Sequence, residues 1–410
     1  MCYAHGPLLT PAEGYMPQPL FCRIVDEVAP HAEIISFTNF GEPWCDPRLP
    51  ERFAPLASHP GVTLMFQTNG TLLDRDRLEL LRNQPNPIRF TVSIDSLDPV
   101  VYASVRPPAH LATVLRNVRN LKKIGRELNF KVVHLELNAV LMARTIAAAP
   151  ALIELAAEVG ADAVRLAHLS VVHPSLASES LYRIPVYTNR VLERCRSLAT
   201  ARGVTLTCPP PFAVTEEEAR RARPTTMSCD LIDDMVQISP SGEVWPCCGN
   251  LPVIGRLDDG VSLNQIWGGL KHQHLRRALA AGQPVGPCRT CRYLERLAPY
   301  LCDSTLVGVN IPPEERCLDP DPDFEQLFPF KWLDDLPLER LRTALKAHLI
   351  EMTRTAPFPD TRRLWHQHLA AAVRRYADRH GLLAASSRTG KVLRRGWRKV
   401  QHTVSRFETP

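Results

Sequence analysis

The chain has 410 residues, 45% hydrophobic and 22% charged, which is typical of a globular protein of two or three domains. No apolar run approaches the roughly 20 residues that cross a bilayer, and an export signal is lacking, so we expect a cytoplasmic protein. Residues 388–410 hold seven Lys or Arg and one acidic residue, so this tail alone carries the net charge of +6. The rest of the chain is close to neutral, which excludes a general nucleic-acid-binding surface.

The first half of the chain alternates apolar runs with helical spacing. Five runs rich in Val, Ile, Phe and Leu predict parallel strands buried on both faces, at 33–41, 62–70, 88–95, 131–142 and 162–169. Amphipathic spacing between them predicts helices, for example over 111–121 and 152–159, and residues 185–206 add a helix and a short strand. This alternation indicates right-handed βαβ units, in either a doubly wound sheet or a (β/α) barrel.

The second half has a different texture. Proline-rich and charged residues at 209–228 predict a linker. Residues 235–248 alternate around Pro-Ser-Gly, which predicts a β-hairpin, and 262–282 predict one amphipathic helix that ends at a capping glycine. Two further helices are expected at about 334–353 and 360–380.

Cysteines carry the strongest chemical signal in this half. Cys229 precedes the predicted hairpin, Cys247 and Cys248 follow it, and Cys288-x-x-Cys291 can turn both sulfurs toward one metal. Twelve cysteines without an export signal favour metal or cluster ligation over disulfides. Four thiolates suit zinc or an iron–sulfur cluster, and spacing does not separate the two.

These motifs in their order resemble the radical S-adenosylmethionine (SAM) superfamily with a C-terminal SPASM or twitch domain. The barrel motifs are TNFGEP at 38–43, QTNGTLL at 67–73 and SIDSLDPVVYASVRPP at 93–108. The second half then contains segments that resemble successive pieces of the auxiliary-cluster domain: SPSGEVWPCCGN, IGRL, IWGG, LRRAL and CRTC. The resemblance covers about residues 1–300.

The resemblance implies an α/β fold: a partial (β/α) TIM-like barrel lacking its first strand, a small β-hairpin/helix cluster-binding domain and a helical C-terminal extension. The implied bounds are 1–208 for the barrel, 209–228 for the linker, 229–317 for the SPASM/twitch domain, 318–387 for the extension and 388–410 for the basic tail.

Cys2 then looks like the last cysteine of the family's C-x-x-x-C-x-x-C loop, which holds a 4Fe–4S cluster. The other two ligands would lie upstream of Met1, through a misplaced start codon or a truncated gene. We therefore expect in-frame cysteine codons two and six positions before Met1. A stop codon or other residues there would indicate a degenerate member of the family.

Family motifs also imply a cofactor site at the carboxyl ends of the strands. Gly41 and Glu42 would contact the amino group of SAM, Ser93 and Asp95 its ribose, and Arg106 its carboxylate. Asn69 would shape the neighbouring loop. The alternative for these residues is turn and helix-cap chemistry. No catalytic residue is identified.

The resemblance implies a radical SAM oxidoreductase or modifying enzyme. It would take hydrogen from a peptide or from a small polyol or sugar, and receive electrons from flavodoxin or ferredoxin. One auxiliary 4Fe–4S cluster would bind Cys229, Cys247, Cys288 and Cys291. The basic tail is a candidate contact for an anionic partner. The alternative is a non-catalytic iron–sulfur or zinc scaffold that has lost the radical cluster.

Overall fold

A computed structural model describes residues 14–37, 41–169, 171, 174–181, 184–213, 229, 231–247, 253–257, 260–283 and 288. The helices expected near 334–353 and 360–380 and the basic tail lie outside these residues, and the domain bounds stay predictions. No helix in the described part is both long and apolar enough to cross a membrane.

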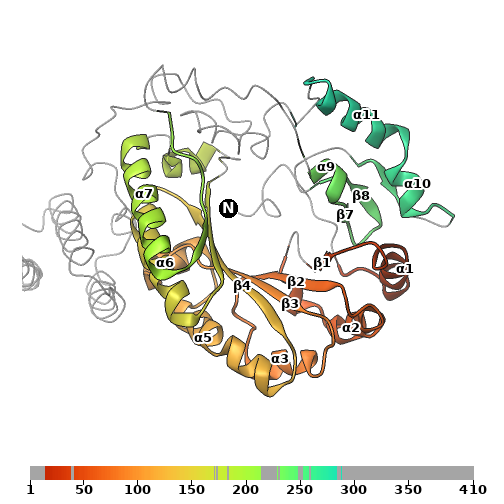
Figure 1. Ribbon diagram of the computed structural model, residues 1–410, viewed down its shortest axis with the longest axis horizontal. Helices are drawn as coiled ribbons and strands as arrows, with labels where there is room; N and C mark the ends of the chain where they lie inside the picture. Colours follow the sequence, from red (N-terminus) through yellow and green to blue (C-terminus); the bar gives the residue numbers. More distant parts are fainter. Residues whose placement is uncertain are drawn as a thin grey trace, which may run out of the picture.

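A curved parallel sheet of six strands forms the main body (Figure 1). The strands are β1 (Ile34–Ser36), β2 (Thr63–Thr68), β3 (Ile88–Ser93), β4 (Val132–Leu141), β5 (Ala163–His168) and β6 (Thr205–Thr207). They confirm the positions of the predicted strands, but β1 is short, and its residues are exposed or half-buried rather than buried on both faces. Their order in the sheet follows the sequence, whereas a doubly wound sheet reverses direction at a switch point. The described fold is therefore a partial barrel.

Helices cover the convex side of this sheet (Figure 1). Those of the first half are α1 (Gln18–Val28), α2 (Leu49–Ala57), α3 (Arg75–Leu78), α4 (Pro99–Val105), α5 (Leu111–Glu127), α6 (Ala149–Val159) and α7 (Pro185–Arg202), with short 3-10 turns at Pro43–Cys45, Glu79–Leu81, Ile146–Ala148 and Pro174–Glu179. The amphipathic spacing predicted α5 to α7. Each connection leads over the same side, so all crossovers have one hand.

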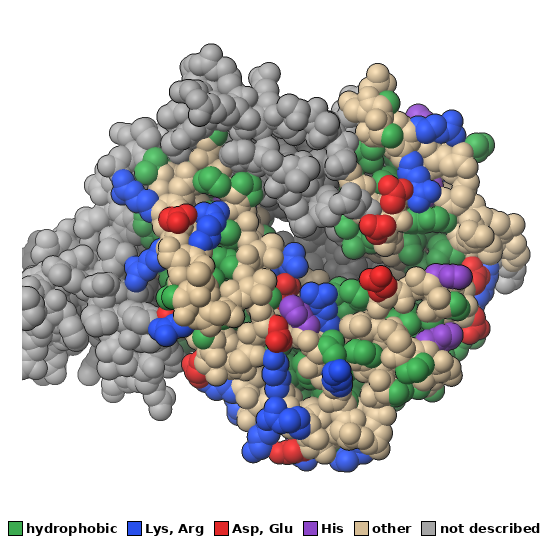
Figure 2. Space-filling view, in the orientation of Figure 1, with side chains coloured by type: hydrophobic (Ala, Val, Ile, Leu, Met, Phe, Trp, Pro, Cys, Tyr) green, Lys and Arg blue, Asp and Glu red, His purple; other side chains and the backbone are tan. Residues whose placement is uncertain are grey.

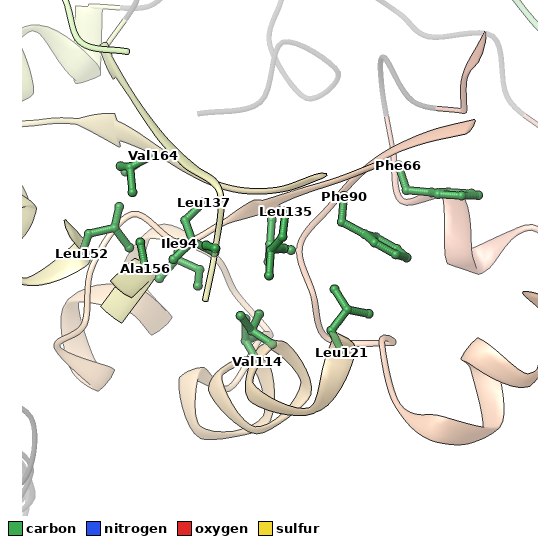
Figure 3. Close-up of a cluster of buried hydrophobic side chains, with 14 of the residues drawn as sticks. Phe66, Phe90, Ile94, Val114, Leu121, Leu135, Leu137, Leu152, Ala156 and Val164 are labelled. Carbon is green, nitrogen blue, oxygen red and sulfur yellow. The ribbon is translucent and has the colours of Figure 1, made fainter. Parts of the chain in front are cut away.

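The main core lies between the sheet and these helices. Phe90 and Leu135 point toward Val114 and Leu121 of α5 (Figure 3), and all four side chains are fully buried. Because side chains alternate along a strand, the residues between them face the concave side. Those residues are mostly polar: Gln67, Thr91, Ser93, Glu136, Asn138 and Arg165. The sheet is thus apolar toward the helices and polar toward the barrel interior.

A small antiparallel sheet forms the second unit. It contains β7 (Gln237–Ile238), β8 (Glu243–Trp245) and β9 (Gly255–Arg256), and α9 (Leu231–Asp234) precedes it. The predicted hairpin is confirmed as β7 and β8, which pair antiparallel. The third strand was not predicted, because two residues are too few to show alternation.

The single helix predicted over 262–282 is wrong. The structure has two helices, α10 (Leu263–Trp267) and α11 (Leu270–Ala280), separated at Gly268 and Gly269. Gly269 is extended, with φ −72° and ψ 162°, and starts α11 as its N-cap. Two adjacent glycines weaken a helix because they lose the most backbone entropy on ordering.

Helix α1 joins the two units (Figure 1). Val25 belongs to the main core, whereas Leu20 and Ile24 pack against the core of the small unit. Glu27 Oε2 accepts a hydrogen bond of 2.6 Å from the backbone N–H of Leu263. Arg23 donates to the carbonyl of Val261. One amphipathic helix thereby fixes the small unit against the barrel.

Candidate cofactor site at the carboxyl ends of the strands

Glu42 lies in the loop after β1 and is held by the carboxyl end of the neighbouring strand β2. Its Oε1 accepts a hydrogen bond of 2.7 Å from the Thr68 hydroxyl, and its Oε2 accepts one of 2.8 Å from the backbone N–H of Asn69. Oε1 also caps the short helix Pro43–Cys45 through the N–H of Trp44, at 3.4 Å. Gly41 precedes it with φ +105°, a conformation that favours glycine. The loop therefore presents one fixed carboxylate.

Burial raises the pKa of Glu42 above its ordinary value. Hydrogen bonds from Asn69, Thr68 and Trp44, and the charge of Arg106, lower the pKa in part. Each carboxylate oxygen can accept more than one hydrogen bond, and Glu42 is only half-buried. An ammonium group would add donors and favour the charged form. The Glu42 carboxylate thus fits the amino group of SAM.

The turn after β2 supports this carboxylate. Asn69 Oδ1 accepts from the N–H of Thr71 at 2.8 Å, and the Thr68 hydroxyl accepts from the N–H of Gly70 at 3.0 Å. Asn117 of α5 donates to the carbonyls of Gly70 and Thr71 at 2.9 and 3.0 Å. Asn69 therefore shapes the turn with its side chain while its backbone holds Glu42.

Asp95, an expected ribose ligand, lies fully buried beside Arg106. Its side chain has no exposed surface; Oδ2 accepts from Arg106 Nε at 2.6 Å and Oδ1 from the N–H of Val140 at 2.8 Å. Both oxygens are thus engaged within the protein. Asp95 orients Arg106, whose two terminal nitrogens make no hydrogen bond to the described residues. Arg106, with 22% of its side chain exposed, can take a carboxylate.

Turn and cap chemistry falls on other residues of the same segment. Asp98 Oδ1 accepts from the N–H groups of Val100 and Val101 at the start of α4, and Ser96 Oγ accepts from the N–H of Asp98. Ser93 ends β3 on the concave side and is not part of this cap. Capping therefore accounts for Ser96 and Asp98 but not for Ser93 or Asp95.

Tyr102 lies beside this ion pair and was not singled out by sequence reasoning. Its hydroxyl is buried and has no hydrogen-bond partner in the described part of the chain. Burial raises its pKa to about 12, with smaller opposing effects of Arg106 and Asp95. The hydroxyl therefore stays protonated as a donor. Thr68 and Asn117 were also missed, although a polar residue at position 117 within the apolar stripe of α5 was a visible signal.

Three of the predicted auxiliary-cluster cysteines contact the small core. Cys288 is buried in it, and Cys229 and Cys247 pack against it. Cys291, the fourth predicted ligand, lies outside the described residues, as do Cys2 and Cys248. Among the residues that are described, no three His, Cys, Asp or Glu side chains are grouped so that they could hold a metal.

Two family models match the chain. Residues 2–139 match the radical SAM superfamily, and residues 229–292 match SPASM, an iron–sulfur cluster-binding domain. The chain therefore contains a radical SAM domain and a SPASM domain. Domains of this superfamily bind SAM and a 4Fe–4S cluster, and SPASM domains bind auxiliary iron–sulfur clusters, which decides between the iron–sulfur and zinc alternatives in favour of the former.

Solved structures with the same fold include other radical SAM proteins. Streptococcus suis SuiB aligns with a TM-score of 0.50 and 15% identity, covering 65% of this chain and 63% of SuiB. SuiB bound to its precursor peptide SuiA aligns with a TM-score of 0.50 and 14% identity, covering 72% of this chain and 67% of SuiB. AnSMEcpe with bound AdoMet aligns with a TM-score of 0.50 and 12% identity, covering 86% of this chain and 92% of anSMEcpe. The chain thus spans less than two thirds of the length of SuiB in the first of these alignments. No curated protein matches it.

Proposed function

We propose that this radical SAM protein is an enzyme that modifies a peptide. The observation that carries the proposal is a pair of opposite charges, each held by residues at the carboxyl end of β2 or β3. Glu42 is held by Thr68 and Asn69, and Arg106 is held by Asp95. The two are close enough for Arg106 to lower the pKa of Glu42. A carboxylate next to a guanidinium complements the ammonium and carboxylate groups of the methionine part of SAM.

Each residue then has a distinct task. Glu42 accepts from the ammonium group, Gly41 lets the backbone turn there, and Arg106 binds the carboxylate. Asp95 keeps Arg106 in place, and Ser93 offers its hydroxyl to the ribose from the end of β3. When bound, the cluster and SAM supply the electron and the carbon-centred radical that takes a hydrogen atom from the substrate.

A peptide is favoured over a polyol or sugar because SuiB has been crystallised with its precursor peptide SuiA. We extend that property to this chain as a proposal. Cys2 is proposed as a ligand of the radical cluster, and Cys229, Cys247, Cys288 and Cys291 as ligands of one auxiliary cluster. Flavodoxin or ferredoxin is the proposed electron donor.

The test is reductive cleavage of SAM by the full-length protein after anaerobic reconstitution with iron and sulfide. We expect 5′-deoxyadenosine on chromatography, and strong loss of it in Glu42→Ala and Arg106→Ala. Arg119→Ala is the matched control, because Arg119 forms an exposed ion pair with Glu158 of α6, away from the site. Protein that loads iron but yields no 5′-deoxyadenosine would instead support the non-catalytic scaffold.

The auxiliary ligands are tested by iron content. Cys288→Ala should lower iron by up to about four atoms per chain, one 4Fe–4S cluster. Cys195→Ala is the matched control, because Cys195 is buried in the main core rather than beside the small sheet. An unchanged iron content in Cys288→Ala would remove Cys288 from the proposed ligands.

A further inference from the structure

A row of polar side chains crosses the concave face of the sheet at the level of the proposed ribose contact. Ser93, Asn138 and Arg165 are register partners on β3, β4 and β5, and Thr207 of β6 continues the row. Apolar neighbours on these strands point to the helices, as Figure 3 shows for Leu137 and Val164, so the polar row faces the interior. Charged side chains gather at the central hollow of the molecule (Figure 2).

Arg165 is fixed in this row by a buried carboxylate. Glu136 Oε1 accepts from Arg165 Nε at 3.0 Å, and Glu136 Oε2 accepts from Arg165 Nη2 at 3.1 Å. The Glu136 side chain is only 5% exposed, whereas that of Arg165 is 37% exposed. Two parallel hydrogen bonds fix the plane of the guanidinium group. Its outer edge therefore faces the interior in one orientation.

Donors remain available along the same row. Arg165 Nη1, the Asn138 amide and the Thr207 hydroxyl form no hydrogen bond with residues that the structure describes. Thr207 is exposed and Asn138 is half-buried. Three neighbouring polar groups of this kind can hold a hydrogen-bonding chain, because they combine donors and acceptors.

The charge of the pair selects the ligand. Glu136 neutralises Arg165, so the row offers oriented donors with little net positive charge. Glu136 weakens the attraction of Arg165 for a free carboxylate, which must also lose its hydration to bind, whereas a carbonyl oxygen accepts the same hydrogen bonds without that cost. We infer that the Glu136–Arg165 pair, with Asn138 and Thr207, binds a main-chain carbonyl group of the peptide substrate.

This inference rests on the proposed function and adds a position to it. Arg165 lies two strands from Ser93, about 10 Å at the usual strand spacing. An extended peptide covers about 10 Å in three residues. The pair would therefore set which residue of the peptide meets the cofactor.

Two N-acetylated tripeptides of equal length test the charge argument. Ac-Ala-Ala-Ala-NH2 ends in a neutral amide, and Ac-Ala-Ala-Ala-OH ends in a free carboxylate. Binding to the full-length reconstituted protein is measured by saturation-transfer NMR on the peptide signals. The wild-type protein should prefer the amide. Arg165→Gln should weaken amide binding about tenfold. Glu136→Gln should strengthen binding of the acid about fivefold to tenfold, because it exposes the charge of Arg165.

Arg119→Gln, which breaks the exposed ion pair with Glu158, should bind both peptides like the wild-type protein. Thr207→Val changes an exposed hydroxyl and leaves the buried pair intact, so it tests the row even if the Glu136 variant fails to fold; it should weaken amide binding about threefold. Preference of the wild-type protein for the acid, unchanged binding in both Arg165→Gln and Thr207→Val, or no saturable binding of either peptide overturns the inference.

The outcome is separable from that of the proposed function. Formation of 5′-deoxyadenosine without the expected peptide binding refutes the role of the pair alone. Peptide binding with the expected variant effects, but without SAM cleavage, refutes the enzymatic proposal and leaves the peptide site standing.

Discussion

Asp95→Asn is the sharpest test of the cofactor site, because the Asp95 side chain has no exposed surface and pairs with Arg106. Asparagine keeps the size of the side chain and one oxygen that can accept from the N–H of Val140. It removes the negative charge that binds Arg106 Nε at 2.6 Å. The substitution therefore leaves the packing in place and releases one guanidinium group.

The cost follows from burial. A hydrogen bond between charged groups contributes about 1.5 to 3 kcal/mol. Because 22% of the Arg106 side chain is exposed, water partly replaces the lost partner, and we expect the lower part of this range, about 1.5 to 2 kcal/mol. A change of this size lowers the melting temperature of a domain of this length by about 3 to 8 °C. Loss of orientation of Arg106 should weaken SAM binding about fivefold, roughly 1 kcal/mol.

Thermal unfolding and equilibrium dialysis with labelled SAM measure the two effects. Asp74→Asn is the matched control: Asp74 caps the short α3 on the surface, and asparagine caps a helix equally well. In a double-mutant cycle, Arg106→Gln should make Asp95→Asn nearly neutral for SAM binding. If Asp95→Asn weakens SAM binding equally in both backgrounds, Asp95 does not act through Arg106 and the positioning role is refuted.

Two further predictions concern neighbouring loops. Because the pKa of Glu42 is raised, the folded protein binds the proton of its carboxyl group more tightly than the unfolded chain does. The stability that this group contributes is therefore present below the ordinary glutamate pKa and is lost as pH rises through the raised pKa. SAM binding needs the Glu42 carboxylate, so the affinity for SAM should fall as pH drops through the raised pKa. Glu42→Gln should abolish this pH dependence, measured by dialysis at about pH 5 to 8. An unchanged pH profile in the variant would contradict the role of Glu42. Gly70→Ala should destabilise the fold by about 2 to 4 kcal/mol in urea unfolding, because φ is +75° and the added Cβ would lie 2.9 Å from Val92 and Val114. Gly160→Ala, with φ +65° and open space around the Cβ position, should cost only about 1 kcal/mol; equal costs would show that crowding at Gly70 is absent.

The sequence by itself determined the order of elements in the first half and the identity of the radical SAM and SPASM domains. Strands β2 to β5 are rich in Val, Ile, Phe and Leu, and such apolar runs predict buried strands without knowledge of their neighbours. The motifs around Glu42, Asn69 and Asp95 follow one another along the chain, so their order could be read without any contact. The hairpin before Cys247 was likewise a local pattern.

Tertiary structure decided the contacts between residues far apart in sequence. Periodicity could not choose between a barrel and a doubly wound sheet, because strand order is a property of the whole sheet. Glu42 meets Thr68 across 26 positions, and Asp95 meets Val140 across 45. The Glu136–Arg165 pair exists because β4 and β5 lie side by side in one register. Hydrogen bonds and ion pairs of this kind depend on the positions of two backbones, which neither local sequence specifies alone.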